Sequence, residues 1–395
     1  MKLLKQAWQL PQREWHRIFS KVDDHTIYFE SNPDFADNAR ALFEYLMEQG
    51  LNETYRIYWA ADRPVPQLDG VKNVVQICKK DKKQVVKALY SSKYIFYTHG
   101  LSGWIREKPG QTVVNLWHGC GYKASRNKDR GRFSLRTLIS TGKMVFDYVL
   151  VPGEVFIETK SEFFRCPKEK VLPIGYPRYD LLRQECRAWP RICEELDIRE
   201  GGRVVMWMPT YRQTGDASYK EGQMKNQYWL PLLHSDEELA ELDRQCARRG
   251  ITLLIKKHRS QAVFHGDNRR FSSIRFLDDS DLERWNTQLY LILPHTDALI
   301  TDYSSIAVDY LLLDKPIAFT LDDYEEYKQL RGFVFEDALA YMPGHHVFET
   351  DQLEAFLDDV CAGNDRYRDD RHRLMPRMQN PTDSYCRRIA EQFEI

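Results

Sequence analysis

Two histidines and a pair of serines stand where an α/β chain places ligand-binding side chains. His118 follows an apolar run and precedes a glycine, which lets the backbone approach a ligand closely. His258 follows another apolar run, within four consecutive basic residues. Ser304 and Ser305 separate a short apolar run from a helical pattern. Imidazoles move protons near neutral pH and hydroxyls at a helix start bind phosphate, so these residue types indicate transfer chemistry on a phosphorylated substrate.

The stretch around the two serines predicts a buried strand at 298–300, a polar loop and a helix at 306–313. A helix start of this kind aims free N–H groups and the positive end of its dipole at whatever lies beyond the strand. Serine and threonine are also ordinary capping residues, so a well-capped crossover is the alternative.

Clustered charges support a binding role at His258. Residues 256–259, Lys-Lys-His-Arg, would repel one another without an anion between them. A lone loop histidine is usually a solvated residue, but the place of His118 among glycines and before Lys123 favours a site. The acidic run 278–281 suggests a helix cap, with a metal site as the alternative.

A second basic stretch covers residues 123–143. It counts seven positive residues against Asp129, a local charge of +6, while the whole chain has 57 Lys and Arg against 58 Asp and Glu, or −1. The overall balance argues against nucleic-acid binding. The local excess favours an anionic membrane leaflet or a phosphate-bearing acceptor, with a solvated face as the alternative.

The N-terminal residues 1–22 mix tryptophans and aliphatic residues with five basic residues. This composition suits a helix on a membrane surface or a terminal helix packed on the protein. The stretch lacks the apolar run of a signal peptide, no segment approaches the roughly 20 apolar residues of a bilayer span, and the eight cysteines form no CxxC pair. We therefore expect a cytoplasmic protein, peripheral on the inner face of the membrane.

Short apolar runs alternate with helical patterns along nearly the whole chain. This rhythm predicts an α/β protein with two doubly wound parallel sheets, which bind ligands at the carboxyl ends of their strands. A polar helical segment at 181–200 divides the rhythm, so we expect an N-terminal acceptor-side or membrane-side domain at 1–185 and a C-terminal donor-binding domain at 186–395. We also expect one helix at 281–293 and two polar helices at 351–395.

Several short motifs occur in a fixed order. They are Phe29-Glu-Ser31 with Asp37-Asn38, Trp117-His118-Gly119 with Lys123, Gly175-Tyr-Pro-Arg178 with Asp180, Pro209-Thr-Tyr-Arg212, Lys256 with His258, Ile300-Thr-Asp-Tyr-Ser-Ser305 with Asp309-Tyr310, and Arg331-Gly-Phe333. In this order the chain resembles the CDP-glycerol glycerophosphotransferases of teichoic acid synthesis, with the related ribitol-phosphate and capsule enzymes.

The resemblance implies a GT-B-like fold of two Rossmann-type domains facing a central cleft. It implies an enzyme that transfers glycerol phosphate or ribitol phosphate from a CDP-alditol to a hydroxyl of a lipid-linked or polysaccharide acceptor, releasing CMP. Its family roles make His118 the base and His258 a donor-phosphate contact. They place Arg212, Lys256, Asp302, Ser304, Ser305, Asp309 and Arg331 at the donor. The implied lipid-linked acceptor agrees with the charge of the second basic stretch, so we expect Lys123, Arg126, Lys128, Arg130 and Arg132 on the acceptor or membrane side. No metal ligand and no cofactor beyond the donor substrate is expected, with a divalent cation left open.

The chain departs from the family pattern at two places. Cys120-Gly121 stand where the family often has Thr-Pro, and Arg259 stands where it often has Pro. The competing interpretations are a nucleotide-sugar glycosyltransferase or epimerase on the same fold, and a non-catalytic scaffold of wall or capsule synthesis.

Overall fold

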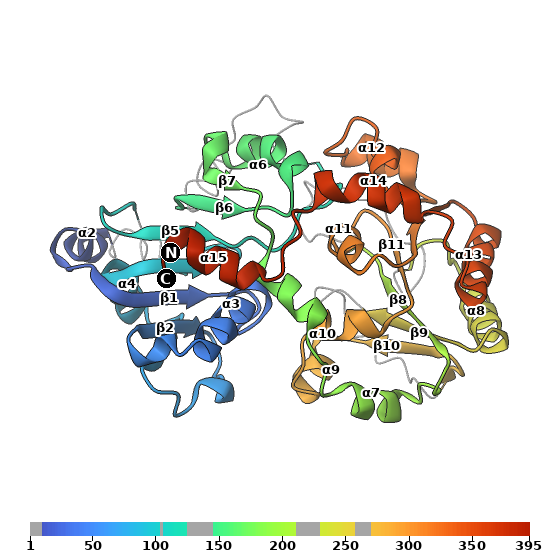
Figure 1. Cartoon of the computed structure of the whole chain (residues 1–395), viewed down its shortest axis with the longest axis horizontal. Coiled ribbons are helices and arrows are strands. Elements are labelled where there is room, and N and C mark those ends of the chain that lie inside the picture. Colours follow the sequence, from blue (N-terminus) through green and yellow to red (C-terminus); the bar gives the residue numbers. More distant parts are fainter. Residues whose placement is uncertain (1–9, 103–105, 125–144, 211–229, 257–269) are drawn as a thin grey trace. The chain divides into compact units, whose positions relative to one another are not determined.

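The computed structural model describes residues 10–102, 106–124, 145–210, 230–256 and 270–395, and only the backbone of residues 10–13. The chain forms two compact units, each built on its own parallel sheet (Figure 1). The first unit comprises Met1–His118, Asp129–Asp180 and Thr382–Ile395, and the second comprises Gly119–Lys128 and Leu181–Pro381. The chain therefore enters the second unit twice and ends in the first.

The sheet of the first unit has seven strands in the order β3-β2-β1-β4-β5-β6-β7, all parallel. The strands are β1 (Asp23–Glu30), β2 (Arg56–Ala61), β3 (Val74–Cys78), β4 (Ser92–Tyr97), β5 (Thr112–Asn115), β6 (Tyr148–Leu150) and β7 (Val171–Leu172). The helices are α2 (Leu10–Phe19), α3 (Asp37–Glu48), α4 (Lys82–Ser91), α6 (Ile157–Phe164) and α15 (Tyr385–Phe393), with short 3-10 turns η1 (Leu51–Glu53), η2 (Pro66–Leu68), η3 (Glu154–Phe156), η4 (Lys168–Lys170) and η5 (Pro177–Arg183).

An aromatic cluster fills the core of the first unit beneath α3. In register, Phe29 of β1 lies opposite Trp59 of β2 and Phe96 of β4, and its ring stacks on both at centroid distances of 5.3 Å and 5.4 Å. Phe43 of α3 meets the rings of Phe29 and Trp59 edge-on. Each such buried ring contributes roughly 1.5–3 kcal/mol. This core fixes the strand ends that carry the loops described below.

The sheet of the second unit has six parallel strands in the order β10-β9-β8-β11-β12-β13. They are β8 (Arg203–Met208), β9 (Ile251–Lys256), β10 (Ile274–Leu277), β11 (Ala298–Thr301), β12 (Ile317–Thr320) and β13 (His345–Val347). The helices are α7 (Trp189–Leu196), α8 (Asp236–Arg248), α9 (Asp279–Arg284), α10 (Leu289–Ile292), α11 (Ile306–Tyr310), α12 (Tyr324–Leu330), α13 (Thr350–Ala362) and α14 (Arg368–Met378), with the turns η7 (Leu293–His295), η8 (Leu311–Leu313) and η9 (Leu339–Tyr341).

The prediction of an α/β fold with two doubly wound parallel sheets is confirmed, and two helix predictions are wrong. The helix expected at 281–293 is divided into α9, α10 and η7, because Asn286 adopts a left-handed φ of +47° that a helix cannot continue through. The stretch 351–395 holds three helices, α13, α14 and α15, where two were expected.

The last helix, α15, belongs to the first unit, where it lies beside α3 (Figure 1). The Asp180 carboxylate accepts hydrogen bonds from the backbone N–H groups of Tyr385 (2.7 Å) and Cys386 (2.8 Å) and so caps the helix start. Gly175 has φ +83°, and a Cβ there would lie 2.3 Å from the Tyr385 ring. The motif Gly175–Asp180 is thus shaped to receive the C-terminal helix.

None of the described helices combines the length and the apolarity that a bilayer crossing requires. The exposed apolar side chains of the described residues instead concentrate on one short helix. Trp15, Ile18 and Phe19 of α2 have relative exposures of 57%, 63% and 65%. They occupy i, i+3 and i+4 positions and therefore form one face of that helix.

Candidate active site

The first sheet reverses its winding between β1 and β4, and open α/β sheets bind ligands at the carboxyl ends of strands at such a point. β1 ends at Glu30, β4 ends before Thr98, and the neighbouring β5 leads into His118. Because all three strands are parallel, their loops meet at the same edge of the sheet. The candidate base therefore lies at the expected edge.

Two side chains from outside the His118 loop, Asn38 and Arg178, hold its backbone, and Asp37 binds Arg178; we call these three residues the histidine clamp. The Asn38 amide donates to the carbonyl oxygens of Leu116 (3.2 Å) and Trp117 (2.8 Å). Arg178 Nη1 donates to the carbonyl oxygen of His118 (3.0 Å) and to Asp37 Oδ1 (2.6 Å). Asn38 and Arg178 are 0% and 4% exposed, so these bonds form away from water.

The histidine clamp compensates for a backbone conformation that is costly by itself. Trp117 has φ +53°, a left-handed geometry that costs a bulky residue about 1–3 kcal/mol. Its backbone N–H donates to Asn115 Oδ1 (2.9 Å), and its carbonyl is held by Asn38. The sharp bend turns His118 out of the line of β5. The Asp37-Asn38 and Gly175–Asp180 motifs thereby acquire a structural explanation, since Asn38 and Arg178 bind this loop.

The surroundings of His118 keep its imidazole neutral. Burial lowers its pKa well below the usual value, and the positive groups of His99, Lys160 and Arg178 lower it further, while a hydrogen bond with the Thr98 backbone opposes them. Within the described residues, Nδ1 of His118 has no hydrogen-bond partner. A neutral ring with an unengaged nitrogen has the protonation state that a general base requires.

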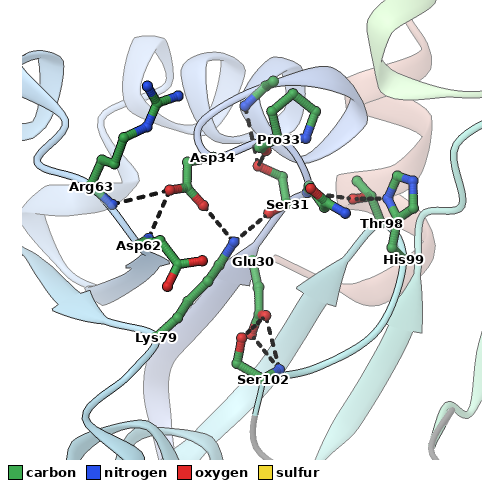
Figure 2. A network of polar contacts seen from close by, with 12 residues as sticks. Glu30, Ser31, Pro33, Asp34, Asp62, Arg63, Lys79, Thr98, His99 and Ser102 are labelled. Atoms are coloured by element: carbon green, nitrogen blue, oxygen red, sulfur yellow. Dashed lines mark hydrogen bonds and ion pairs between the residues drawn. The ribbon is translucent and has the colours of Figure 1, made fainter. Parts of the chain in front are cut away.

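A buried polar network braces the same edge of the sheet (Figure 2). The Glu30 carboxylate accepts from the Ser102 backbone N–H (2.9 Å) and the Tyr28 hydroxyl (2.7 Å), and burial raises its pKa. Lys79 Nζ donates to the Ser31 carbonyl (2.7 Å) and to Asp34 (2.5 Å). Burial alone would raise the pKa of Asp34, but the hydrogen bond and the charge of Lys79 lower it below its usual value. These contacts join the ends of β1 and β3 to the loop after β4, so the edge is rigid.

The equivalent switch point of the second sheet lies between β8 and β11. Asp302, directly after β11, is fully buried, and its carboxylate accepts the Thr210 N–H at 3.0 Å with both oxygens. It therefore fixes the loop after β8. Ser305 is the N-cap of α11 and, within the described residues, makes no side-chain capping bond. Its φ and ψ of −63° and −18° are already helical, so its hydroxyl does not cap the helix. The capped crossover that the sequence analysis gave as the alternative is therefore not formed by Ser305.

The segment after His118 packs on this serine loop within the second unit. A Cβ on Gly121 would lie 2.9 Å from both the backbone nitrogen and the Cα of Ser305. Lys123 forms an antiparallel bridge with Phe333, and the Val334 N–H donates to the Tyr122 carbonyl (2.7 Å). The structure thus joins the motifs at 121–124, 303–305 and 331–333, which lie far apart in the sequence.

Other predicted donor residues engage protein groups. Lys256 is 6% exposed, and its Nζ lies 2.6 Å from Asp279 Oδ1. Asp309 is fully buried and accepts a short hydrogen bond from the Tyr290 hydroxyl. Arg331 is half-buried at the end of α12. The donor roles of these residues, like those of Asp302, Ser304 and Ser305, stay predictions.

Six predicted site residues lie outside the described part of the chain. They are His258, Arg212, Arg126, Lys128, Arg130 and Arg132. In the acidic run, Asp278 and Asp281 form the capping box of α9, which matches the helix-cap interpretation. The described residues hold no group of three or more His, Cys, Asp or Glu placed to bind a metal ion.

One residue at the first site was missed by the sequence analysis. His99 follows β4, and its ring stacks on that of His118 with centroids 4.1 Å apart and planes 12° apart. The signal was present, because His99-Gly100 repeats the His118-Gly119 pattern after a buried strand. The clamp residues stood within recognised motifs, but the pattern could not show that they converge on one loop.

Comparisons with known proteins identify the family of the chain. The family described as CDP-glycerol:poly(glycerophosphate) glycerophosphotransferase matches residues 12–391. The teichoic acid ribitol-phosphate polymerase TarK of Staphylococcus aureus is 27% identical, over 85% of this chain and 62% of its own length. The teichoic acid glycerol-phosphate transferase of the same organism is 27% identical, over 83% of this chain and 82% of its own. Against TarK and the related polymerase TarL, the chain spans 62% and 58% of their lengths.

A solved structure of the wall teichoic acid polymerase TagF superposes with a TM-score of 0.74 at 22% identity, covering 100% of this chain and 96% of that one. That protein is a histidine variant soaked with CDPG. The likeness extends over both sheets and identifies the fold as GT-B-like. Because the family match runs through nearly the whole chain, this protein belongs to the CDP-glycerol:poly(glycerophosphate) glycerophosphotransferase family.

Proposed function

We propose that this protein transfers an alditol phosphate from CDP-glycerol or CDP-ribitol to a hydroxyl of a lipid-linked or polysaccharide acceptor, in teichoic acid or capsule synthesis. The observation that carries the proposal is the geometry of His118: the histidine clamp holds its loop at the switch-point edge of the first sheet, and its Nδ1 has no hydrogen-bond partner within the described residues. Family membership supplies the donor class.

In the proposed reaction His118 removes the proton from the acceptor hydroxyl. The hydroxyl oxygen attacks the phosphorus that bears the alditol, and the bond from that phosphorus to the bridging oxygen breaks. The bridging oxygen leaves with its electron pair as part of CMP, and the proton passes from His118 to solvent. Positive groups near the departing phosphate stabilise its charge.

We assign the donor to the second unit. Ser304 and Ser305 are the described candidates for the pyrophosphate, because the Ser305 hydroxyl is not used as a cap. His258, Arg212, Lys256 and Arg331 would supply positive charge. Asp302 would act through the loop after β8, which its carboxylate fixes. The first unit would then hold the acceptor.

We further propose that the chain works on an anionic lipid surface. α2 contacts α4 on one side and exposes Trp15, Ile18 and Phe19 on the other, and the basic segment at 123–143 is the second contact. When these three residues are replaced by serine, the amount of protein that sediments with vesicles of anionic lipid should fall to a small part of the wild-type amount. Replacing the exposed Leu330 and Phe348 by serine is the matched control and should change little. Equal sedimentation of both variants would contradict a role for α2.

The reaction is tested by CMP release from CDP-glycerol and from CDP-ribitol, with a UDP-sugar control, a membrane extract as acceptor source, and parallel assays with EDTA. His118→Ala should lower CMP release about 100-fold or more, because a general base is lost. His295→Ala, in the second unit, is the matched histidine control and should stay near wild type. UDP release would indicate a glycosyltransferase instead, and wild-type activity in His118→Ala would refute the proposed base. Loss of activity in EDTA would establish a divalent cation.

A further inference from the structure

Two imidazoles stand face to face at the switch-point edge of the first sheet. The His99 and His118 rings are 4.1 Å apart and inclined by only 12°, and the Trp117 ring lies 4.1 Å from His118 at 43°. His118 therefore has flat partners in His99 and Trp117. Stacking of this kind restricts rotation of the ring about its side-chain bonds.

His99 is itself fixed by the polar network. Its Nδ1 lies 3.0 Å from Thr98 Oγ1, and Thr98 is fully buried (Figure 2). The same hydroxyl oxygen accepts the backbone N–H of Asn32 at 3.2 Å, so its own proton is available for His99 Nδ1. Asn32 adjoins Ser31, whose carbonyl accepts from Lys79, so the contacts continue into the braced edge of the sheet.

We infer that His99 is a positioning residue for His118, holding the plane of the reactive imidazole by stacking while Thr98 holds His99. The inference rests on the proposed function for the role of His118, but the pairing of the rings does not. In this arrangement the His118 ring keeps one orientation, and a positive charge on either ring makes the other ring harder to protonate.

The charged groups around His118 come from four parts of the first unit. His99 faces it from the loop after β4, Lys160 from α6 and Arg178 from η5, with Asp37 of α3 neutralising part of the Arg178 charge. After burial, His99 is the largest cause of the lowered His118 pKa. Removing His99 should therefore make His118 easier to protonate, and the acid limb of the pH–rate profile should move to higher pH.

The test uses the full chain with three variants. His99→Phe keeps a flat ring without charge, and His99→Ala removes both ring and charge. His295→Ala is the matched control, since His295 stacks on Trp189 at 4.5 Å and 14° in the second unit, and burial also lowers its pKa. The measurements are the NMR titration of the His118 ring and CMP release as a function of pH.

We expect His99→Phe and His99→Ala to titrate His118 at higher pH than wild type, and His295→Ala to leave that titration unchanged. At pH values above the titration of His118, the rate of CMP release by His99→Phe should stay within about threefold of wild type. The rate of His99→Ala should fall about tenfold or more, because the His118 ring is no longer aligned. A His118 titration unchanged in both His99 variants would overturn the inference, even if their folding were impaired. A shifted titration in a protein that releases no CMP from any donor would support the pairing and refute the proposed function.

Discussion

The two candidate sites are built in opposite ways. The His118 site is assembled from side chains that come from α3, the loop after β4, α6 and η5, with Asn38 and Arg178 separated by 140 residues in sequence. The serine site is largely local, since the end of β11, the loop and the first turn of α11 form one continuous stretch. Its long-range partners among the described residues include Thr210, held by Asp302, Gly121, which packs on Ser305, and Asp323, which accepts from the Tyr303 hydroxyl.

The difference indicates what each chemistry demands. A base requires a ring with a controlled protonation state, and burial, stacking and charge from several elements provide that control. A phosphate site requires hydroxyls and N–H groups in one turn of chain, which a single loop provides. The first site should therefore be sensitive to substitutions far away in sequence, and the second mainly to changes in its own stretch and in Gly121.

The largest effect is expected at Gly121. In Gly121→Ala the new Cβ would lie 2.9 Å from the Ser305 backbone, so either the segment 119–124 or the serine loop must move. A shift of this size should lower CMP release about 100-fold. Gly100→Ala is the control, because a Cβ there meets nothing within 4 Å and its φ is not left-handed. Normal kinetics in Gly121→Ala would mean that the serine site tolerates displacement and is not the donor site.

A smaller effect, on both stability and rate, is expected at Asn38. Asn38→Ala leaves the buried carbonyls of Leu116 and Trp117 without this donor, which should reduce the free energy of unfolding by about 2–4 kcal/mol and CMP release about tenfold. Chemical denaturation and steady-state kinetics measure the two effects. Asn52 donates to the Lys72 carbonyl in a solvent-exposed hydrogen bond, so Asn52→Ala is a matched control that should change stability by less than about 0.5 kcal/mol. If the two variants were equally stable, the assembled character of the first site would be disproved.

The smallest effect is expected in the pH dependence of stability. His118 in the folded chain has a lowered pKa, whereas in the unfolded chain it titrates near 6.5. Above about pH 6.5 the ring is neutral in both the folded and the unfolded chain, so the free energy of unfolding does not depend on the protonation of His118. As the pH falls below about 6.5, the unfolded state binds the proton first, so stability should fall by up to about 1.4 kcal/mol per pH unit from this residue. Thermal unfolding of wild type should therefore decline more steeply between pH 7 and pH 5 than that of His118→Gln. Parallel curves would show that His118 is not shielded in the folded protein.

The contrast between the sites also explains what the sequence could predict. Strands such as 203–208 and the serine loop were predictable because periodicity and residue type act over a few neighbouring residues. The histidine clamp was not, because nothing in the pattern of Asp37, Asn38 or Arg178 states which loop they reach. The division of 281–293 was missed since a left-handed Asn286 has no periodic signature. His99 was overlooked although it carried the same His-Gly signal as His118.

The capping of α15 by Asp180 has a consequence for how the protein is made. Asp180 and Ser384 are separated by 204 residues (384 − 180), and Asp180 holds the start of a helix that completes the first unit. At about 5–20 residues per second, a ribosome needs roughly 10–40 s to deliver that helix after Asp180 has been made. During this interval the face of α3 that α15 contacts is uncovered, while residues 181–381 of the second unit are synthesised. The first unit can therefore be completed only after residues 382–395 have been synthesised, so its assembly follows the synthesis of the second unit.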